Sequence, residues 1–199
     1  EMDTCLFMRW SSEGKLTLVL IYVDDILIAG ATEGVIAELR EHIGQHFEMS
    51  CLGPVRRYLN VRVTYTVGVS VCLDQEEYTL DILERFALHW NVLGRGKDKT
   101  TPLPAKAQEK IYDEWSPAVD SPEYGWWKAF PFRSIIGAVL YLALNTRPDI
   151  AFAVGLLARS GNQPSYGASV CTCWLMSYLK NTAGEDIRFQ MAHLIDLQG

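Results

Sequence analysis

Short apolar runs separated by polar turn residues dominate the first part of the chain. Residues 5–8 and 16–23 are two such runs, and they predict a hairpin whose second strand is buried on both faces. Asp24 and Asp25 interrupt the apolar residues, and residues 26–29 resume them. A tight polar pair between two apolar strands predicts a second hairpin with both aspartates at its turn.

A helical repeat of apolar positions follows and predicts a helix that ends near Phe47. Alternating residues from 59 to 65 predict a strand with one wet face, and residues 69–73 predict its return partner. A second helix is expected over residues 74–86, because its start has the spacing of a capping box. This order of elements predicts an α+β fold over residues 1–90, with an antiparallel sheet and helices on one face.

The residue composition and the spacing of apolar positions change in the second half of the chain. Glycine and proline punctuate residues 91–125, which predicts a linker or a long surface loop. Residues 126–199 are predicted to be mostly helical, with apolar positions at helical spacing around 135–140, 150–157 and 170–178. Three parts are therefore expected along the chain.

Composition excludes several classes of protein. The chain has 199 residues, of which 49% are hydrophobic, and its net charge is −6, which argues against disorder and against a strongly basic nucleic-acid binder. Its five cysteines are odd in number and scattered, and no signal-like segment opens the sequence, so reduced thiols in an intracellular protein are expected. The longest apolar run, residues 135–144, is about half of what a membrane-spanning helix needs, so no membrane partner is expected.

The negative charge is concentrated near the start of the chain. Residues 1–53 carry three basic and nine acidic residues. A solvated acidic surface is the usual meaning of such a cluster, and Asp24-Asp25 is also good turn chemistry. The alternative is a cation site, because adjacent carboxylates backed by buried strands are costly to keep ionised without a cation, and Mg²⁺ takes one or two such ligands.

The residues around the two aspartates add a resemblance. Tyr-Val-Asp-Asp-Ile-Leu-Ile-Ala-Gly at 22–30 resembles the active-site hairpin of copia-type retrotransposon reverse transcriptases. Further segments resemble elements of that family in the same order. They are Cys5-Leu6-Phe7, His46-Phe47-Glu48-Met49 with Leu52-Gly53, residues 58–63, Gln75-x-x-Tyr78, Thr101-Pro102-Leu103, residues 132–137, Thr146-Arg147-Pro148-Asp149-Ile150 and Tyr178-Leu179-Lys180-x-Thr182.

The resemblance implies a palm domain over residues 1–90, a linker, and a helical thumb or connection region after residue 125. It also implies catalytic roles at the hairpin. Asp24 corresponds to a metal-ligating aspartate, Asp25 is its neighbour with a less direct role at the metal ions, and Tyr22 would lie against the primer terminus or the template. The implied cofactor is Mg²⁺ in a two-metal site.

Residues 56–63 resemble the strand region that holds the primer. The resemblance implies nucleic-acid contacts by Arg56, Arg57, Leu59, Asn60 and Arg62. The arginines are expected either to meet phosphate or to form a solvated basic strand face. Asn60 stands where the family has glycine, which bears on the close backbone approach that glycine allows. Another departure is Tyr166-Gly167, in place of the family's His-Trp.

The implied activity is RNA-directed DNA synthesis, in which a primer 3′-hydroxyl attacks the α-phosphate of a nucleotide. The implied partners are an RNA or DNA primer–template and a dNTP, and the implied location is cytoplasmic virus-like particles, the nucleus or both. No other carboxylate matches the family's further palm aspartate, so the chain alone is expected to be inactive. A non-catalytic nucleic-acid or protein interaction module and a non-functional retroelement relic are the alternatives, and no pattern indicates an oligomeric state.

Overall fold

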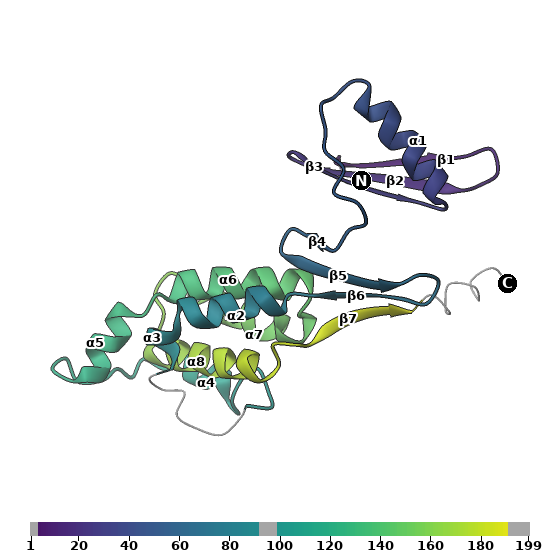
Figure 1. Cartoon of the computed structure of the whole chain (residues 1–199). Helices are drawn as coiled ribbons and strands as arrows, with labels where there is room; N and C mark the ends of the chain where they lie inside the picture. The colour runs from purple at the N-terminus through teal and green to yellow at the C-terminus, as the bar shows by residue number, and fades with distance from the viewer. Residues whose placement is uncertain (1–3, 92–98, 191–199) are drawn as a thin grey trace. The chain divides into compact units, whose positions relative to one another are not determined.

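The computed structural model describes residues 4–91 and 99–190 (Figure 1). The chain forms two compact units, residues 1–55 and residues 56–199. Both units combine helices with antiparallel sheets, so the predicted α+β class is confirmed.

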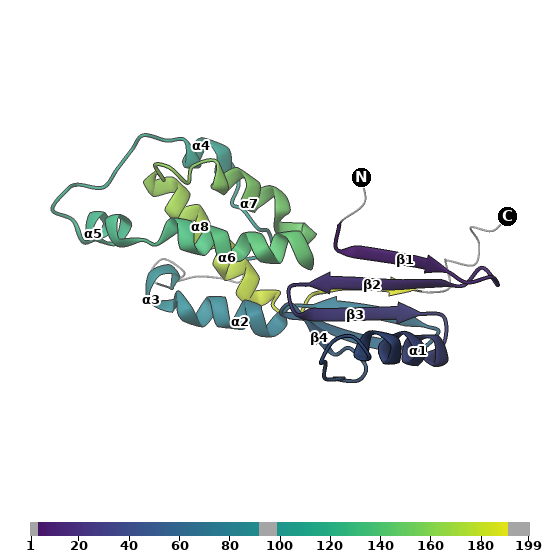
Figure 2. The same cartoon turned by 90° about the horizontal axis from the view of Figure 1, so that it is seen from above.

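The first unit is a three-stranded antiparallel sheet with one helix. Its strands are β1 (Leu6–Trp10), β2 (Leu16–Tyr22) and β3 (Asp25–Gly30), in the spatial order β1-β2-β3. Helix α1 (Glu33–Gly44) packs along the sheet (Figures 1 and 2). Both predicted hairpins are therefore confirmed.

Burial in this unit differs from the sequence-based expectation. Strand β2 is not buried on both faces, and Thr17 is the one buried residue among residues 4–55. Helix α1 lies over the face that carries Thr17, since a Cβ added at Gly30 would meet Ile36 at 3.2 Å and Thr17 at 3.8 Å. The prediction of burial on both faces was wrong because a continuous apolar run does not show how many faces of the strand are covered, and here one helix covers one face.

The second unit contains a four-stranded antiparallel sheet, β4-β5-β6-β7. Its strands are β4 (Arg57–Tyr58), β5 (Val61–Thr66), β6 (Ser70–Asp74) and β7 (Asp186–Gln190). Strand β7 was not predicted, and it pairs Ile187 with Leu73 and Phe189 with Val71. The single sheet expected over residues 1–90 is therefore replaced by two sheets, one in each unit.

The same unit carries the remaining helices. They are α2 (Glu76–Arg85), α3 (Ala87–Trp90), α4 (Ala107–Ile111), α5 (Pro122–Ala129), α6 (Phe132–Asn145), the 3₁₀ helix η1 (Pro148–Ile150), α7 (Ala151–Ala158) and α8 (Tyr166–Asn181). Helix α8 packs against α2, α4, α6 and α7 (Figure 2). The three helices predicted after residue 125 are confirmed.

The core of the second unit joins α2 to these later helices. Ile82 of α2, Ile135 and Val139 of α6, and Leu175 of α8 are fully buried in one cluster. The boundary between the compact units thus falls after Val55, and α2 belongs with the helical part. The palm, linker and thumb boundaries, as functional parts, stay predictions.

The described part of the expected linker is not a plain loop. Helix α4 lies within it, and its residues Ala107 and Ile111 are buried against the core. Residues 92–98 of the expected linker and residues 191–199 of the expected helical region lie outside the described residues. No single helix in the described ranges has the length and apolarity to cross a membrane, although α5 and α6, bent by 55°, pass that test as a pair.

Candidate functional site

The two candidate metal ligands sit at the tip of the β2–β3 hairpin. Tyr22 and Asp25 are the last paired residues of the ladder, so Val23 and Asp24 form a two-residue turn. Val23 has φ of 56° and Asp24 does not have a positive φ, which is the sign pattern of a type II′ turn. A β-branched residue in this region is strained, at a cost of order 1–3 kcal/mol, so the tip is held in a tight conformation by the ladder behind it.

The hairpin tip is open to solvent. Asp24 and Asp25 are both exposed, and Tyr22 and Val23 expose 53% and 85% of their surfaces. The carboxylate oxygens of Asp24 and Asp25 are ligands of the kind that Mg²⁺ prefers, and Mg²⁺ often takes one or two carboxylates together with water and phosphate. Over residues 4–91 and 99–190, no group of three or more His, Cys, Asp and Glu side chains is arranged to hold a metal ion. The two carboxylates fit Mg²⁺ in their chemistry, and by themselves they would make up only part of a coordination shell.

The expected primer-holding residues lie in the second unit, around a different hairpin. Leu59 and Asn60 form the turn between β4 and β5, with φ of 48° and 60°. Positive φ at both central residues is the type I′ pattern, and asparagine is among the residues that tolerate it best. The strand expected to begin at Leu59 therefore begins at Val61, and Asn60 meets the conformational demand that glycine would meet.

Helix α6 holds this turn in place. The hydroxyl of Tyr141 donates a hydrogen bond to the carbonyl oxygen of Leu59. The backbone N–H of Val63 donates to the carbonyl of Arg56 at 2.9 Å, which extends the hairpin beyond the two paired residues of β4. The Arg56 side chain is exposed.

Two of the candidate arginines are engaged by carboxylates. Arg62 donates from Nε to Asp74 Oδ2 at 2.8 Å and from Nη2 to Glu76 Oε2 at 2.9 Å, and Arg57 pairs with Glu77. The hydrogen bond to Asp74, followed by the one to Glu76, raises the pKa of Arg62 above its ordinary value. Both arginines are thus paired with carboxylates instead of simply solvated, and their contact with phosphate stays a prediction.

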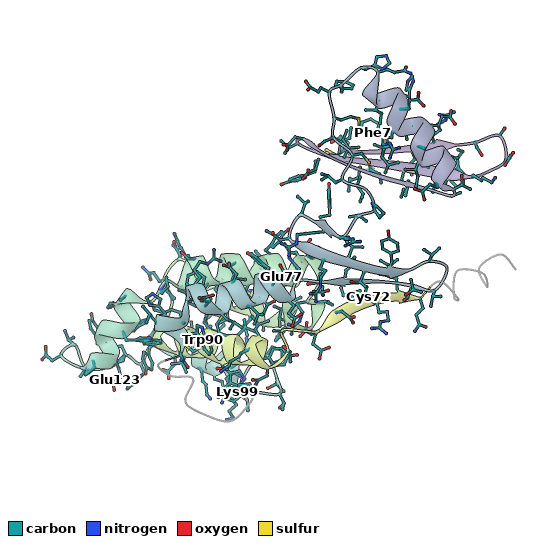
Figure 3. All side chains as sticks on the ribbon, viewed as in Figure 1. Phe7, Cys72, Glu77, Trp90, Lys99 and Glu123 are labelled. Carbon is teal, nitrogen blue, oxygen red and sulfur yellow. The ribbon has the colours of Figure 1, made fainter. Side chains whose placement is uncertain are left out.

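The pairing of these carboxylates with the arginines was not predicted from the sequence. The spacing that predicted a helix start at Asp74 was the signal that could have indicated it. Asp74 Oδ1 accepts from the backbone N–H of Glu76 at 3.2 Å, at the first residue of α2. Glu77 lies beside it at the start of α2 (Figure 3). Acidic residues are favoured at a helix N-terminus, and here they also face the arginines of the neighbouring hairpin.

A second missed cluster joins two of the motifs that carry the family resemblance. Arg147 is 2% exposed and donates to both carboxylate oxygens of Asp149 at 2.9 and 2.8 Å. It also donates to the carbonyl oxygen of Thr182 at 2.8 Å and to the Thr182 hydroxyl at 2.6 Å. The hydroxyl of Tyr178 donates to Asp149 at 2.8 Å. These residues tie η1 to the C-terminal end of α8, so their role in this unit is structural.

Opposing effects act on the acid of this cluster. Partial burial works to raise the pKa of Asp149, but hydrogen bonds from Arg147 and Tyr178 outweigh it and hold that pKa below its ordinary value. For Arg147, burial works to lower the pKa, and the hydrogen bond and charge of Asp149 reverse that effect and raise it. The pair is therefore ionised at neutral pH.

Comparison with known proteins places the chain in a family. Residues 1–102 match the family described as "Reverse transcriptase (RNA-dependent DNA polymerase)". The Retrovirus-related Pol polyprotein from transposon TNT 1-94 of Nicotiana tabacum is 31% identical over 94% of this chain and 14% of its own length. The corresponding polyprotein from transposon RE1 of Arabidopsis thaliana is 28% identical over 98% of this chain and 12% of its own length.

A shorter relative covers more of its own length. An uncharacterized mitochondrial protein of Arabidopsis thaliana is 30% identical over 82% of this chain and 61% of that protein. The chain thus spans about one eighth of the polyproteins and under two thirds of this shorter relative. No solved structure matches the chain. The family match and the transposon relatives confirm the resemblance drawn from the motifs, and the chain belongs to the reverse transcriptases of copia-type retrotransposons.

Proposed function

We propose that this chain supplies the metal-binding hairpin and the primer-holding turn of an RNA-directed DNA polymerase. The observation that carries the proposal is the β2–β3 hairpin, which presents Asp24 and Asp25 together at an exposed tight turn. The polymerase would act on an RNA or DNA primer–template and a dNTP. Action inside the cell, in cytoplasmic virus-like particles or the nucleus, belongs to the same proposal.

Each hairpin residue has a role in this proposal. Asp24 is the metal ligand, and the strained turn at Val23 limits the directions in which its carboxylate points. Asp25 adds a second negative charge, and the exposed ring of Tyr22 offers a surface for the primer terminus or the template. Bound Mg²⁺ ions would activate the primer 3′-hydroxyl and stabilise negative charge on the phosphate during attack.

We expect the 199 residues on their own to lack polymerase activity. Two carboxylates hold Mg²⁺ weakly without further ligands, and the described residues supply no third ligand near them. A primer-extension assay with Mg²⁺ and the purified chain should show no template-dependent synthesis. Synthesis that is abolished by Asp24→Asn would contradict this expectation.

The metal-binding role itself can be tested without activity. Mn²⁺, a paramagnetic substitute for Mg²⁺, should broaden the amide NMR signals around residues 22–27 at millimolar concentration, and Asp24→Asn should remove the effect. Asp113 and Glu114 are an internal control, since they are also adjacent, exposed carboxylates but lie outside any hairpin. Equal broadening at both places would show that the hairpin is an ordinary acidic surface and would refute the role.

The alternative of a non-catalytic interaction module gains no specific support. Residues 126–182 carry five basic residues and one acidic residue. However, Arg147 is buried against Asp149, and Arg133 donates to the carbonyl of Gly161 at 2.6 Å and to Asn162 at 2.8 Å. Two of the five basic side chains are therefore already bound to groups within the unit.

A further inference from the structure

The β4–β5 hairpin places two like charges directly opposite each other. Arg57 and Arg62 are partners in the antiparallel ladder. Opposed like charges destabilise a strand pair unless an anion lies near both. In this chain the anions come from the end of β6 and the first turn of α2, as Asp74, Glu76 and Glu77.

The contacts have the form that arginine uses to bind phosphate. The Arg62 guanidinium makes two charge-assisted hydrogen bonds, to Asp74 and Glu76, and Arg57 pairs with Glu77. A planar guanidinium with paired donors suits carboxylate and phosphate oxygens equally well. The carboxylates therefore occupy the positions that phosphate oxygens would take.

We infer that Glu76 and Glu77 compete with nucleic-acid phosphates for Arg62 and Arg57, and so lower the affinity of this hairpin for nucleic acid. The inference rests on the proposed function, which takes the β4–β5 hairpin as the primer-holding segment. A phosphate that binds here must first displace these carboxylates. Affinity and its salt dependence are set by that exchange.

The three carboxylates differ in their freedom to leave. The Asp74 side chain is 9% exposed, and its second oxygen also accepts from the Glu76 N–H, so it is fixed in place. The Glu76 and Glu77 side chains expose 39% and 60% of their surfaces, and each makes a single side-chain ion pair that a phosphate can replace. Glu76 and Glu77 are the exchangeable members.

The surroundings strengthen the competition. A groove of about 300 Å³ lies along these residues, and its lining includes four carboxylates but only two guanidinium groups. Asp81 is the fourth carboxylate. The groove as folded is thus net negative and repels a phosphate backbone. Removal of one of these charges should make the groove less negative, and removal of two should make it neutral.

The test uses the full chain and a fluorescently labelled RNA–DNA primer–template duplex, with affinity measured by anisotropy from low to moderate salt. Glu76→Gln and Glu77→Gln should each tighten binding by about two- to fivefold, which corresponds to the usual strength of an exposed ion pair. The double variant should also steepen the slope of log affinity against log salt, by about 0.7–0.9 for each arginine released to a phosphate.

Glu84→Gln is the matched control. Glu84 is an exposed glutamate on the same helix, about 10–12 Å further along its axis at 1.5 Å per residue. Its loss changes the net charge equally but frees no arginine. At about 0.1 M salt and above, where the Debye length is about 10 Å or less, affinity should therefore change by less than about 1.5-fold. Circular dichroism should show the same helix content in all variants.

A reversal experiment completes the test. Arg57→Gln added to Glu77→Gln should return the affinity to the level of the unchanged chain. If the duplex binds but Glu76→Gln and Glu77→Gln behave like Glu84→Gln, the competition is refuted while the primer-holding role stands. If neither the chain nor any variant binds the duplex at low salt, both the competition and the primer-holding role are refuted.

Discussion

The replacement Gly167→Ala should destabilise the helical unit, although alanine is the better helix former. Gly167 is the second residue of α8, where a Cβ would lie 1.9 Å from the backbone carbonyl oxygen of Lys110 in α4 and 2.7 Å from its carbon. Real Cβ atoms essentially never come closer than 3.0 Å. Helix α4 would therefore have to move away by about 1 Å, because the obstacle is backbone and cannot rotate aside.

Neighbouring contacts resist that movement. The hydroxyl of Ser165 donates to the carbonyl of Ile111 at 2.6 Å and also accepts from Ala168 N–H at the start of α8. Ile111 is 1% exposed. Overpacking of this kind costs about 1–3 kcal/mol, and a weakened hydrogen bond adds about 1 kcal/mol. The helix propensity of alanine returns at most about 1 kcal/mol, so a net loss of about 1–3 kcal/mol is expected.

Thermal and urea unfolding of the full chain would measure this loss. For a unit of this size the expected fall in Tm is about 3–10 °C. The control variants are Gly137→Ala in α6 and Gly155→Ala in α7, where a Cβ would meet nothing within 4 Å. Each should stabilise the chain by about 0.5–1 kcal/mol. A Gly167→Ala variant that is as stable as these controls would refute the close approach of α4 and α8.

Three further predictions concern the buried ion pair and the hairpin tip. Arg147→Met should lower the free energy of unfolding by about 2–4 kcal/mol in urea denaturation, somewhat less than for a fully buried pair because the Asp149 side chain is 38% exposed. Because the pKa of Asp149 is depressed in the folded state, its contribution is present above its ordinary pKa of 3.8 and is lost as pH falls through the lower folded value. Unfolding measured between pH 2 and 6 should therefore show a shallower acid loss in Asp149→Asn than in the unchanged chain, and identical slopes would exclude this linkage. Val23→Gly should relieve the positive-φ strain and stabilise the first unit by about 1 kcal/mol, while NMR relaxation should show a more mobile tip; a destabilised hairpin would contradict the strain.

Local features of the chain were predicted well from the sequence. The two hairpins of the first unit, the helix after them and the three later helices all appear close to their predicted positions. The second hairpin was located because a polar pair between apolar strands is a local signal, but its turn falls at Val23-Asp24, one residue before the predicted Asp24-Asp25. Helix ends were less accurate, since α1 stops at Gly44, before the predicted end near Phe47.

The turn at Leu59 and Asn60 shows where local patterns mislead. Alternation predicted a strand through both residues, but their positive φ values form a type I′ turn. The apolar and polar pattern of a strand is compatible with a turn at its first residues, because side-chain alternation carries no direct information on φ. Asparagine in place of the family's glycine was the available clue.

By itself, the sequence determined the local elements, the position of the Asp24-Asp25 pair and the resemblance to copia-type reverse transcriptases, since each of these depends on residues close together in the chain. Only the tertiary structure decided which distant residues meet. Strand β7 pairs with β6, and Arg57 and Arg62 form ion pairs with carboxylates at the end of β6 and the start of α2. Arg147 donates a hydrogen bond to the carbonyl oxygen of Thr182. The structure also shows that Gly167, a departure from the family pattern, is the residue that admits α4 against α8. Such contacts depend on tertiary packing, and the periodic pattern of one segment does not indicate which other segment packs against it.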